Sequence, residues 1–179
     1  MIIYEPAEDS YLLESVISNY VKNKSVLDIG TGSGILAKKA IISGAKSVLA
    51  IDINEHAVKK LKEEGLNSVK SNLFQKINGK FGVILCNPPY LPENKKEDQE
   101  SKTITTGGKK GDEFILRFLK QATKHLEHKG KILLLLSSLT PRTKIINFLS
   151  KNKLSHKSIV SKNLFFETLE VWEIYYNNA

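Results

Sequence analysis

Residues 25–34, Ser-Val-Leu-Asp-Ile-Gly-Thr-Gly-Ser-Gly, decide the fold class of this 179-residue chain. Three of the first five residues are apolar, which is typical of a short buried strand, and glycines at alternate positions then break it. Glycine adopts positive φ and lets the backbone pass close to a ligand. A helical pattern follows over Ile35–Ser43. The stretch therefore predicts a strand, a tight turn and a helix whose free N–H groups face the turn.

The same alternation of apolar runs and helical periods continues on both sides of this stretch. Upstream, apolar side chains at helical spacing predict a helix over Pro6–Val21. Downstream, further apolar runs alternate with helical segments, and two closing strands follow with no helix between them. The predicted strands are Ser25–Ile29, Ser47–Ile51, Ser68–Ser71, Phe81–Cys86, Lys131–Leu136, one near Ile159 and Leu169–Tyr176; the further helices are Ile35–Ser43, one that Asn54 caps and that runs to Glu64, Asp112–Glu127 and Pro141–Lys151.

This order of elements predicts the fold class. Strands that alternate with helices form a mostly parallel sheet with helices on both faces, whereas strands joined without a helix pair antiparallel. We therefore predict an α/β fold with a seven-stranded, mostly parallel sheet that ends in an antiparallel hairpin. The length and the 41% hydrophobic composition support one core, so a single domain over residues 1–179 is expected. Residues 91–110 show no periodicity, and we interpret them as a substrate loop.

Composition and charge indicate where in the cell the protein is expected and which kinds of partner it is expected to bind. The chain has no run of about 18 apolar residues and no basic segment ahead of an apolar one, so neither a spanning helix nor a signal peptide is expected. The single cysteine, Cys86, lies in an apolar run, which favours a buried thiol in a cytoplasmic protein. The net charge of +8 suggests a nucleic-acid partner, but only Arg117 and Arg142 are arginines and the lysines are scattered. We therefore favour a solvated surface over a nucleic-acid interface.

An acidic residue ends the second predicted strand. Asp52 lies about twenty residues after the glycine-rich turn, where a carboxylate accepts hydrogen bonds from both hydroxyls of a ribose. The turn and the carboxylate together indicate a cofactor that contains adenosine. S-adenosylmethionine (SAM) and a nicotinamide dinucleotide both meet this description, and these two features do not separate them.

The motif Asn87-Pro88-Pro89-Tyr90, at the carboxyl end of the fourth predicted strand, separates the two cofactors. An amide or aromatic amine nitrogen has a delocalised lone pair, so a methyltransferase must hold its N–H hydrogens with acceptors and aim the lone pair at the methyl group. The Asn87 oxygen and the Pro88 carbonyl are two such acceptors. The prolines fix the turn, and Tyr90 can cover the planar group. The motif therefore predicts an SAM-dependent N-methyltransferase.

Several segments together carry a resemblance to a known family. They are Tyr4–Ser10 (Tyr-Glu-Pro-Ala-Glu-Asp-Ser), Asp28–Gly34, Asp52 and Asn87–Tyr90, and the likeness continues through Gly107–Gly111. The chain resembles the HemK/PrmC-like protein glutamine N5-methyltransferases, and more closely their short archaeal and eukaryotic branch, which lacks the bacterial N-terminal helical domain. The resemblance implies the Rossmann-like fold of the class I SAM-dependent methyltransferases.

The resemblance also implies a reaction, a cofactor and partners. These enzymes use SAM to methylate the side-chain amide of the glutamine in the Gly-Gly-Gln motif of class-1 translation termination (peptide chain release) factors. Members of this branch often work as a heterodimer with a small zinc-ribbon activator protein, which pairs with an edge strand. The weak third strand, Ser68–Ser71, is the docking edge that we expect for such an activator.

The resemblance assigns roles to individual positions of this sequence. Asn87 would hold the target amide, and Asp52 would bind the ribose of the cofactor. Asn72 and Leu73 would flank the adenine, although Asn72 stands where many relatives have an acidic residue. The catalytic set is Asn87, Pro88 and Tyr90, and the cofactor-binding set is Ser10, Asp28, Gly30, Gly32, Asp52, Asn72, Leu73 and Asn87.

Other functions stay open on the sequence alone. N-methylation of adenine or guanine in RNA or DNA fits the Asn87–Tyr90 motif and the positive charge, and it predicts salt-sensitive nucleic-acid binding. Lysine methylation of a protein is a variant in which the ammonium target must first lose a proton. A scaffold that binds SAM without catalysis is a further alternative, although residues competent for the chemistry fill the expected site. The dispersed histidines and the lone cysteine predict no metal site.

Overall fold

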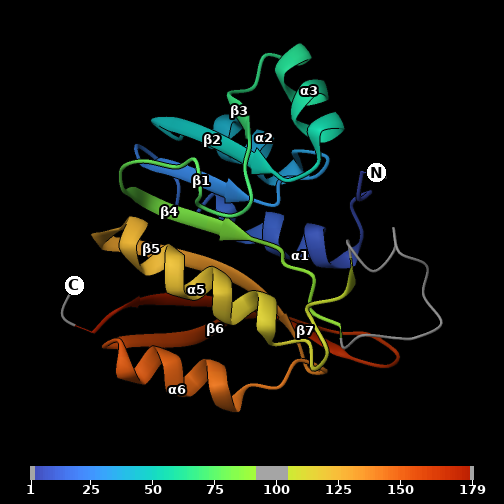
Figure 1. The fold of residues 1–179 in the computed structure, drawn as a ribbon, viewed down its shortest axis with the longest axis vertical. Helices are drawn as coiled ribbons and strands as arrows, with labels where there is room; N and C mark the ends of the chain where they lie inside the picture. The colour runs from blue at the N-terminus through green and yellow to red at the C-terminus, as the bar shows by residue number, and fades with distance from the viewer. Residues whose placement is uncertain (1–2, 92–104, 178–179) are drawn as a thin grey trace.

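The structure, a computed structural model, describes residues 3–91 and 105–177, and the middle of the predicted substrate loop lies outside these residues. In the described part of the chain, one sheet has the strand order β3-β2-β1-β4-β5-β7-β6 (Figure 1). Strands β1 to β5 run parallel, and β7 is antiparallel to both of its neighbours. The strands are β1 (Ser25–Ile29), β2 (Ser47–Asp52), β3 (Ser68–Lys70), β4 (Phe81–Cys86), β5 (Leu126–Ser137), β6 (Leu154–Asn163) and β7 (Thr168–Tyr176).

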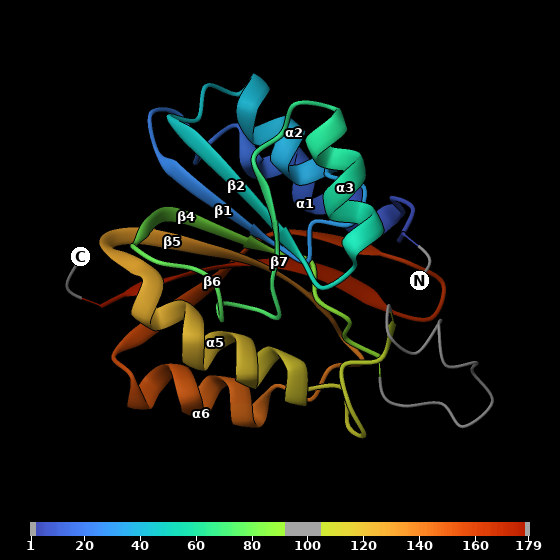
Figure 2. The same ribbon diagram turned by 45° about the horizontal axis from the view of Figure 1, so that its top comes forward.

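The predicted α/β class is confirmed, with a parallel centre and an antiparallel hairpin at one end of the sheet. Helices α1 to α3 cover one face, and α5 and α6 cover the other (Figures 1 and 2). Successive side chains of β4 supply both cores: Val83 and Leu85 pack on the side of α1 and α2, whereas Ile84 and Cys86 pack on the side of α5 and α6. The helices are α1 (Glu8–Ile17), α2 (Ile35–Ile42), α3 (Glu55–Glu63), α5 (Glu113–His125) and α6 (Thr143–Lys151).

The register of the parallel strands decides where a ligand site can form. Ile29, the last residue of β1, pairs with Ile51 of β2 on one side and with Cys86 of β4 on the other. These three strands therefore end side by side, and open α/β sheets bind ligands beyond the carboxyl ends of their strands. The glycine-rich turn, Asp52 and Asn87 meet at these ends, although they are far apart in the sequence.

The beginning of β5 differs from the prediction. The helical pattern had suggested a helix up to Glu127 and a strand from Lys131, but the structure ends α5 at His125 and begins β5 at Leu126. The buried Leu126 pairs with Phe81 of β4, and the register shifts before the next pair. Pairing with a neighbouring strand has therefore overridden a local helical pattern, as tertiary contacts often do.

The helix boundaries follow local signals in most places. The Asn54 side chain accepts a hydrogen bond from the His56 N–H at 3.0 Å, so the predicted cap of α3 is confirmed. Helix α1 ends at Ile17, earlier than predicted, because the chain turns there and the Tyr20 N–H bonds to the Ile17 carbonyl at 2.9 Å.

Two expectations about the surroundings of the chain can also be compared with the structure. The Cys86 side chain is buried, as expected. In the part of the chain that the structure describes, no helix combines the length and the apolar character that crossing a membrane requires.

Candidate functional site

A pocket of about 480 Å³ opens at the carboxyl ends of β1, β2 and β4. Its volume falls within the range of roughly 300–1,000 Å³ that is usual for small-molecule sites. The walls come from the glycine-rich turn, the end of β2, the segment after β3, the turn after β4, the N-terminal segment and the start of α5. The predicted site residues that line it are Gly30, Gly32, Asp52, Asn72, Leu73, Asn87, Pro88 and Tyr90.

The glycine-rich turn is held by hydrogen bonds to the end of β2. The Gly30 N–H bonds to the Ile51 carbonyl at 2.9 Å. The Asp52 carboxylate accepts the Gly32 N–H with Oδ2 and the Asn54 N–H with Oδ1, each at 2.8 Å. Because each carboxylate oxygen carries about two lone-pair sites, Asp52 can still accept hydrogen bonds from hydroxyl groups in the pocket.

Two glycines of this turn differ in their surroundings. Gly30 and Gly34 both have positive φ, at +71° and +80°. A Cβ atom added at Gly30 would meet no atom within 4 Å, whereas at Gly34 it would lie 2.4 Å from Cδ2 of the fully buried Leu61. Gly34 therefore allows α2 to pack against α3, while Gly30 leaves open space beside the pocket.

Asp28 lies beneath the glycine-rich turn. Its side chain is fully buried, and its Oδ2 atom accepts a hydrogen bond from the Thr31 hydroxyl at 2.6 Å. Its Oδ1 atom has no hydrogen-bond partner among the described residues. Burial raises the pKa of Asp28 to about 7, and the Thr31 hydrogen bond partly offsets this effect. Asp28 thus lies close to the pocket but is not one of the residues that line it.

The carboxamide of Asn87 is held on one side. Its Nδ2 atom donates to the Ser10 hydroxyl at 3.3 Å, whereas its Oδ1 atom is buried and has no partner in the described part of the chain. A buried acceptor without a donor destabilises a fold by about 1–3 kcal/mol. An atom of this kind in the wall of a pocket is a candidate for binding a ligand N–H group.

The N-terminal segment fixes Ser10, which does not itself line the pocket. Asp9 Oδ1 accepts the Ser10 N–H at 2.6 Å and the Ser10 hydroxyl at 3.2 Å, and Asp9 Oδ2 accepts the Tyr4 hydroxyl at 2.8 Å. With its proton directed to Asp9, the Ser10 hydroxyl can accept from the Asn87 amide. Burial, followed by the negative charge of Asp9, raises the pKa of Tyr4 well above its ordinary value of 10, so this phenol stays protonated.

A hydrogen bond and a close backbone contact hold the rest of the Asn87–Tyr90 turn in place. The Thr140 hydroxyl donates to the Tyr90 carbonyl at 3.3 Å. A Cβ atom added at Gly107 would lie 2.7 Å from the Pro89 carbonyl oxygen, which is closer than real Cβ contacts allow. The segment Gly107–Gly111 therefore packs closely against the Asn87–Tyr90 turn and supports it. This contact gives a physical reason why the segment belongs to the family resemblance.

Sequence reasoning missed some of the pocket residues. Phe114 and Arg117, at the start of α5, both line the pocket, and the Arg117 guanidinium lies 5.5 Å from the centre of the Phe114 ring. A signal was present, because Arg117 is one of two arginines in the chain and lies one helical turn after Phe114. Tyr4 and Asp9, which belong to the Tyr4–Ser10 segment that carries the family resemblance, line the pocket as well. Within residues 3–91 and 105–177, no group of three His, Cys, Asp or Glu side chains is arranged to hold a metal ion.

Comparison with known proteins identifies the family. The model of the methyltransferase small domain matches residues 8–167, a range that includes both the glycine-rich turn and the Asn87–Tyr90 turn. The chain belongs to this family. The pocket of this methyltransferase domain is therefore formed mostly by segments that the family model covers, with the N-terminal segment around Tyr4 added outside it.

Relatives of this methyltransferase confirm the resemblance to protein glutamine methyltransferases. A Methanocaldococcus jannaschii protein, provisionally named a protein N5-glutamine methyltransferase, is 44% identical over 153 residues, which cover 81% of this chain and 77% of the relative. The release factor glutamine methyltransferase of Aquifex aeolicus is 32% identical over 145 residues, which cover 71% of this chain. The match spans 52% of the Aquifex protein, so this chain corresponds to about half of its length.

A solved structure has the same fold over nearly the whole chain. It is the Mtq2–Trm112 complex of E. cuniculi, described as responsible for the methylation of the eRF1 translation termination factor. The TM-score is 0.80 at 26% sequence identity, and the match covers 98% of this chain and 99% of that one. The sheet, the helices and the C-terminal hairpin are therefore common to both proteins.

Proposed function

We propose that this methyltransferase transfers a methyl group from SAM to the side-chain amide nitrogen of the glutamine in the Gly-Gly-Gln motif of a class-1 translation termination factor. The observation that carries the proposal is the buried, unpartnered Asn87 oxygen in the wall of a pocket that also contains the glycine-rich turn and Asp52. The two relatives, which are 44% and 32% identical and whose names state glutamine methylation, support the choice of target.

The turn after β4 suits the chemistry of an amide. A glutamine amide nitrogen is a poor nucleophile because its lone pair is shared with the carbonyl group, so the lone pair must be turned toward the methyl group during transfer. In the proposed reaction, Asn87 Oδ1 and the Pro88 carbonyl accept the two N–H hydrogens and stabilise the positive charge that develops on nitrogen. The methylated nitrogen is a very weak base, so its surplus proton leaves to water without a strong general base.

Residues behind the pocket give Asn87 a defined orientation. An amide side chain that is free to turn presents either its oxygen or its nitrogen to a ligand. The bond from Asn87 Nδ2 to Ser10, with Ser10 held in turn by Asp9, favours the orientation in which the oxygen is available. We therefore assign Ser10 and Asp9 to the positioning of Asn87.

The pocket fits SAM as the methyl donor. When bound, SAM supplies a methyl group on a positively charged sulfur atom. Asp52 keeps lone pairs for ribose hydroxyls, and the open space at the exposed Gly30 allows a ligand to approach closely. The Asp9 carboxylate and the ring of Tyr90 suit a nearby cation. We assign Asn72 and Leu73 to the adenine, and Asp28 to support of the glycine-rich turn from below.

The outer edge of β3 is the proposed docking site for an activator subunit. β3 is the terminal strand on its side of the sheet, and an edge strand can accept a strand of another protein through main-chain hydrogen bonds. The similar E. cuniculi protein was solved as a complex with Trm112. We propose that a small zinc-ribbon activator forms a heterodimer with this chain along Ser68–Lys70.

Methyl transfer from radiolabelled SAM tests the proposed function. The acceptors are a purified archaeal-type termination factor, the same factor with Gln→Ala in its Gly-Gly-Gln motif, and bulk tRNA and rRNA, each with and without a zinc-ribbon activator. We expect label on the intact factor and none on the Gln→Ala factor. Label on RNA alone would overturn the proposal in favour of base methylation, and label that survives the Gln→Ala change would move the target to another residue.

A further inference from the structure

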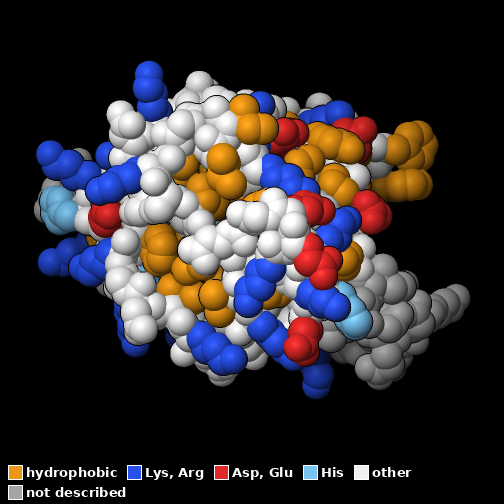
Figure 3. All heavy atoms as spheres, turned by 90° about the horizontal axis from the view of Figure 1, so that it is seen from above, with side chains coloured by type: hydrophobic (Ala, Val, Ile, Leu, Met, Phe, Trp, Pro, Cys, Tyr) orange, Lys and Arg blue, Asp and Glu red, His pale blue; other side chains and the backbone are white. Residues whose placement is uncertain are grey.

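The turn between β6 and β7 exposes two adjacent aromatic side chains. We call residues 164–167 the hairpin tip. Phe165 and Phe166 are 93% and 84% exposed, and their rings meet edge to face with centroids 4.6 Å apart. In the space-filling view, hydrophobic side chains project from the right-hand edge, the side on which this turn lies in Figures 1 and 2 (Figure 3). Contiguous exposed apolar side chains in a folded protein commonly mark an interaction site.

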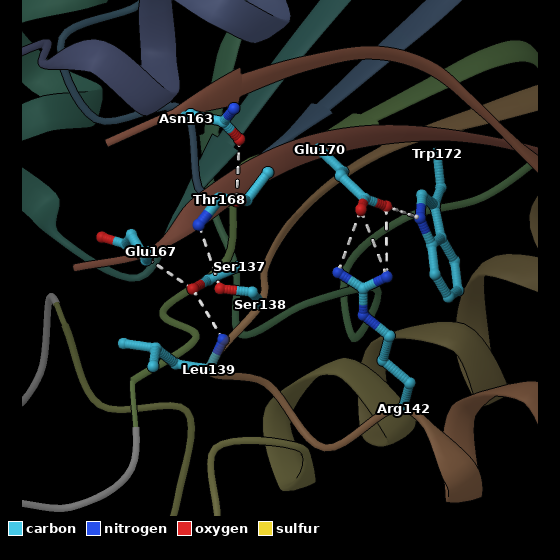
Figure 4. A network of polar contacts seen from close by, with 9 residues as sticks. All are labelled: Ser137, Ser138, Leu139, Arg142, Asn163, Glu167, Thr168, Glu170 and Trp172. Atoms are coloured by element: carbon cyan, nitrogen blue, oxygen red, sulfur yellow. Dashed lines mark hydrogen bonds and ion pairs between the residues drawn. The ribbon is translucent and has the colours of Figure 1, made fainter. Parts of the chain in front are cut away.

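Several hydrogen bonds hold the hairpin tip in place. The Leu164 N–H bonds to the Glu167 carbonyl at 2.7 Å, which closes the turn. At its base, the Ser137 hydroxyl donates to the Glu167 carboxylate, and the Thr168 N–H donates to the Ser138 hydroxyl at 2.9 Å (Figure 4). A tip held in this way loses little conformational freedom when a partner binds, so its aromatic surface contributes more of its burial to affinity.

The hairpin tip lies near the pocket, although residues 164–167 are not among those that line it. Glu167, next to Phe166 in the chain, accepts the Ser137 hydroxyl, and the Ser137 carbonyl accepts the Thr140 N–H at 3.1 Å. The Thr140 hydroxyl donates in turn to the Tyr90 carbonyl at 3.3 Å, and the charge of Glu167 contributes to the raised pKa of Tyr4 and Tyr90 after burial and the charge of Asp9. Both tyrosines line the pocket. The hairpin is also joined to the N-terminal segment by an ion pair between Lys162 and Glu8, the residue before Asp9. A molecule whose target group enters the pocket therefore passes close to the tip.

The chemistry of the tip favours a protein partner over RNA. Binding of a phosphate backbone depends on lysine and arginine side chains. Within residues 162–168 the sole cation is Lys162, which is paired with Glu8, and the charge beside the phenylalanines is the acid Glu167. An aromatic pair in a stretch whose one cation is already paired is typical of the apolar centre of a protein–protein interface.

The proposed target motif also requires contacts outside the pocket. Gly-Gly-Gln presents one side chain, so the pocket can recognise the glutamine but little of what surrounds it. We propose that the hairpin tip binds an apolar surface of the protein substrate beside its Gly-Gly-Gln loop, an inference that rests on the proposed function. Phe165 and Phe166 then supply affinity for the whole factor, while Asn87 and its neighbours supply the chemistry.

Steady-state kinetics with the double variant Phe165→Ser/Phe166→Ser test this inference. Both side chains are solvent-exposed, so the variant keeps its core. With the intact termination factor, and with the activator present if the wild type needs it, we expect KM to rise roughly tenfold or more, as for the loss of anchoring interface residues. We expect kcat at saturation, the Kd for SAM and the KM for a short Gly-Gly-Gln peptide to stay within about twofold. Ile42→Ser is the matched control, because Ile42 is 83% exposed at the end of α2, a helix that packs on β1 and β2.

Each outcome of this experiment decides for or against the inference. A KM for the intact factor that stays within about twofold of the wild-type value, or an equal rise in the Ile42→Ser control, would overturn docking at the tip but leave glutamine methylation intact. A wild-type dimer in sedimentation that disappears in the double variant would assign the tip to a second copy of this chain and also overturn the inference. Failure of the wild type to label the factor would instead defeat the proposed function, and docking with it.

Discussion

Two turns lie together at the carboxyl ends of the parallel strands: the glycine-rich turn after β1 and the Asn87–Tyr90 turn after β4. They differ in whether their polar groups have hydrogen-bond partners within the protein. In the first turn, the N–H groups of Gly30 and Gly32 have partners at the end of β2. In the second turn, the Asn87 oxygen is buried without a partner in the described part of the chain. The first turn therefore has its hydrogen bonds satisfied within the protein, whereas the second keeps an acceptor that a ligand can use.

This difference predicts which changes reduce stability and which reduce activity. A satisfied turn contributes to folding, so substitutions there destabilise the protein before they affect chemistry. An unsatisfied polar group in a pocket lowers stability and is kept for function, which is the usual trade-off at active sites. Asp28 is an informative exception, because it lies under the first turn but is itself buried with one unpartnered oxygen.

Asn87→Ala has the largest expected effect and tests the second turn directly. Loss of one preorganised acceptor raises a reaction barrier by about 2–4 kcal/mol, so kcat should fall roughly 30- to 1,000-fold. The melting temperature should stay the same or rise, because the variant removes a buried acceptor that has no partner. Kinetics with the termination factor and thermal unfolding measure the two effects, with Asn19→Ala on the surface as control. Methyl transfer near the wild-type rate would refute the assigned role of Asn87.

The sequence predicts the first turn better than the second, for a physical reason. Buried apolar runs and glycines are local features, so the strands from Ser25 to Cys86 and the ends of α2 and α3 follow from short segments. The partner of Asn87 is Ser10, which lies 77 residues earlier, and no local pattern shows that pairing. The start of β5 at Leu126 likewise depends on the facing Phe81. Contacts of this kind arise only once the sheet has formed.

Gly34→Ala should cause the next largest effect, and it tests whether the first turn is structural. A non-glycine residue at φ of +80° is strained by about 1–2 kcal/mol, and the added Cβ would also press on the end of the buried Leu61 side chain and so overpack the core by about 1–2 kcal/mol. We expect a loss of about 2–4 kcal/mol in the free energy of unfolding, measured by urea denaturation. Gly30→Ala has a similar φ and no clash, so it should lose only the strain component. Equal losses in the two variants would mean that the contact with Leu61 is unimportant.

Asp28→Asn is expected to change the pH dependence of stability. The folded-state pKa of about 7 lies above the ordinary value of 3.8, so the neutral form is favoured by folding. Stability linked to Asp28 is therefore fully present below about pH 4 and is lost as pH rises through 7. Relative to Asp28→Asn, the wild type without cofactor should lose roughly 1–3 kcal/mol of unfolding free energy between pH 5 and pH 8, because the slope below the folded-state pKa is about 1.4 kcal/mol per pH unit. Urea denaturation of both proteins at the two pH values measures this difference, and a constant gap between them would contradict the raised pKa.

Ser10→Ala should have the smallest effect, and it tests how the second turn is oriented before a ligand arrives. Loss of the hydroxyl removes the acceptor of the Asn87 amide, so the carboxamide can rotate and present its nitrogen to the substrate. The expected loss is about 1 kcal/mol, or roughly fivefold in kcat, with the Kd for SAM unchanged. Ser15→Ala is the matched control on the same helix, because the Ser15 hydroxyl bonds only to the Leu12 carbonyl among the contacts seen here. A weaker Kd for SAM with unchanged kcat would show instead that Ser10 contacts the cofactor and does not orient Asn87.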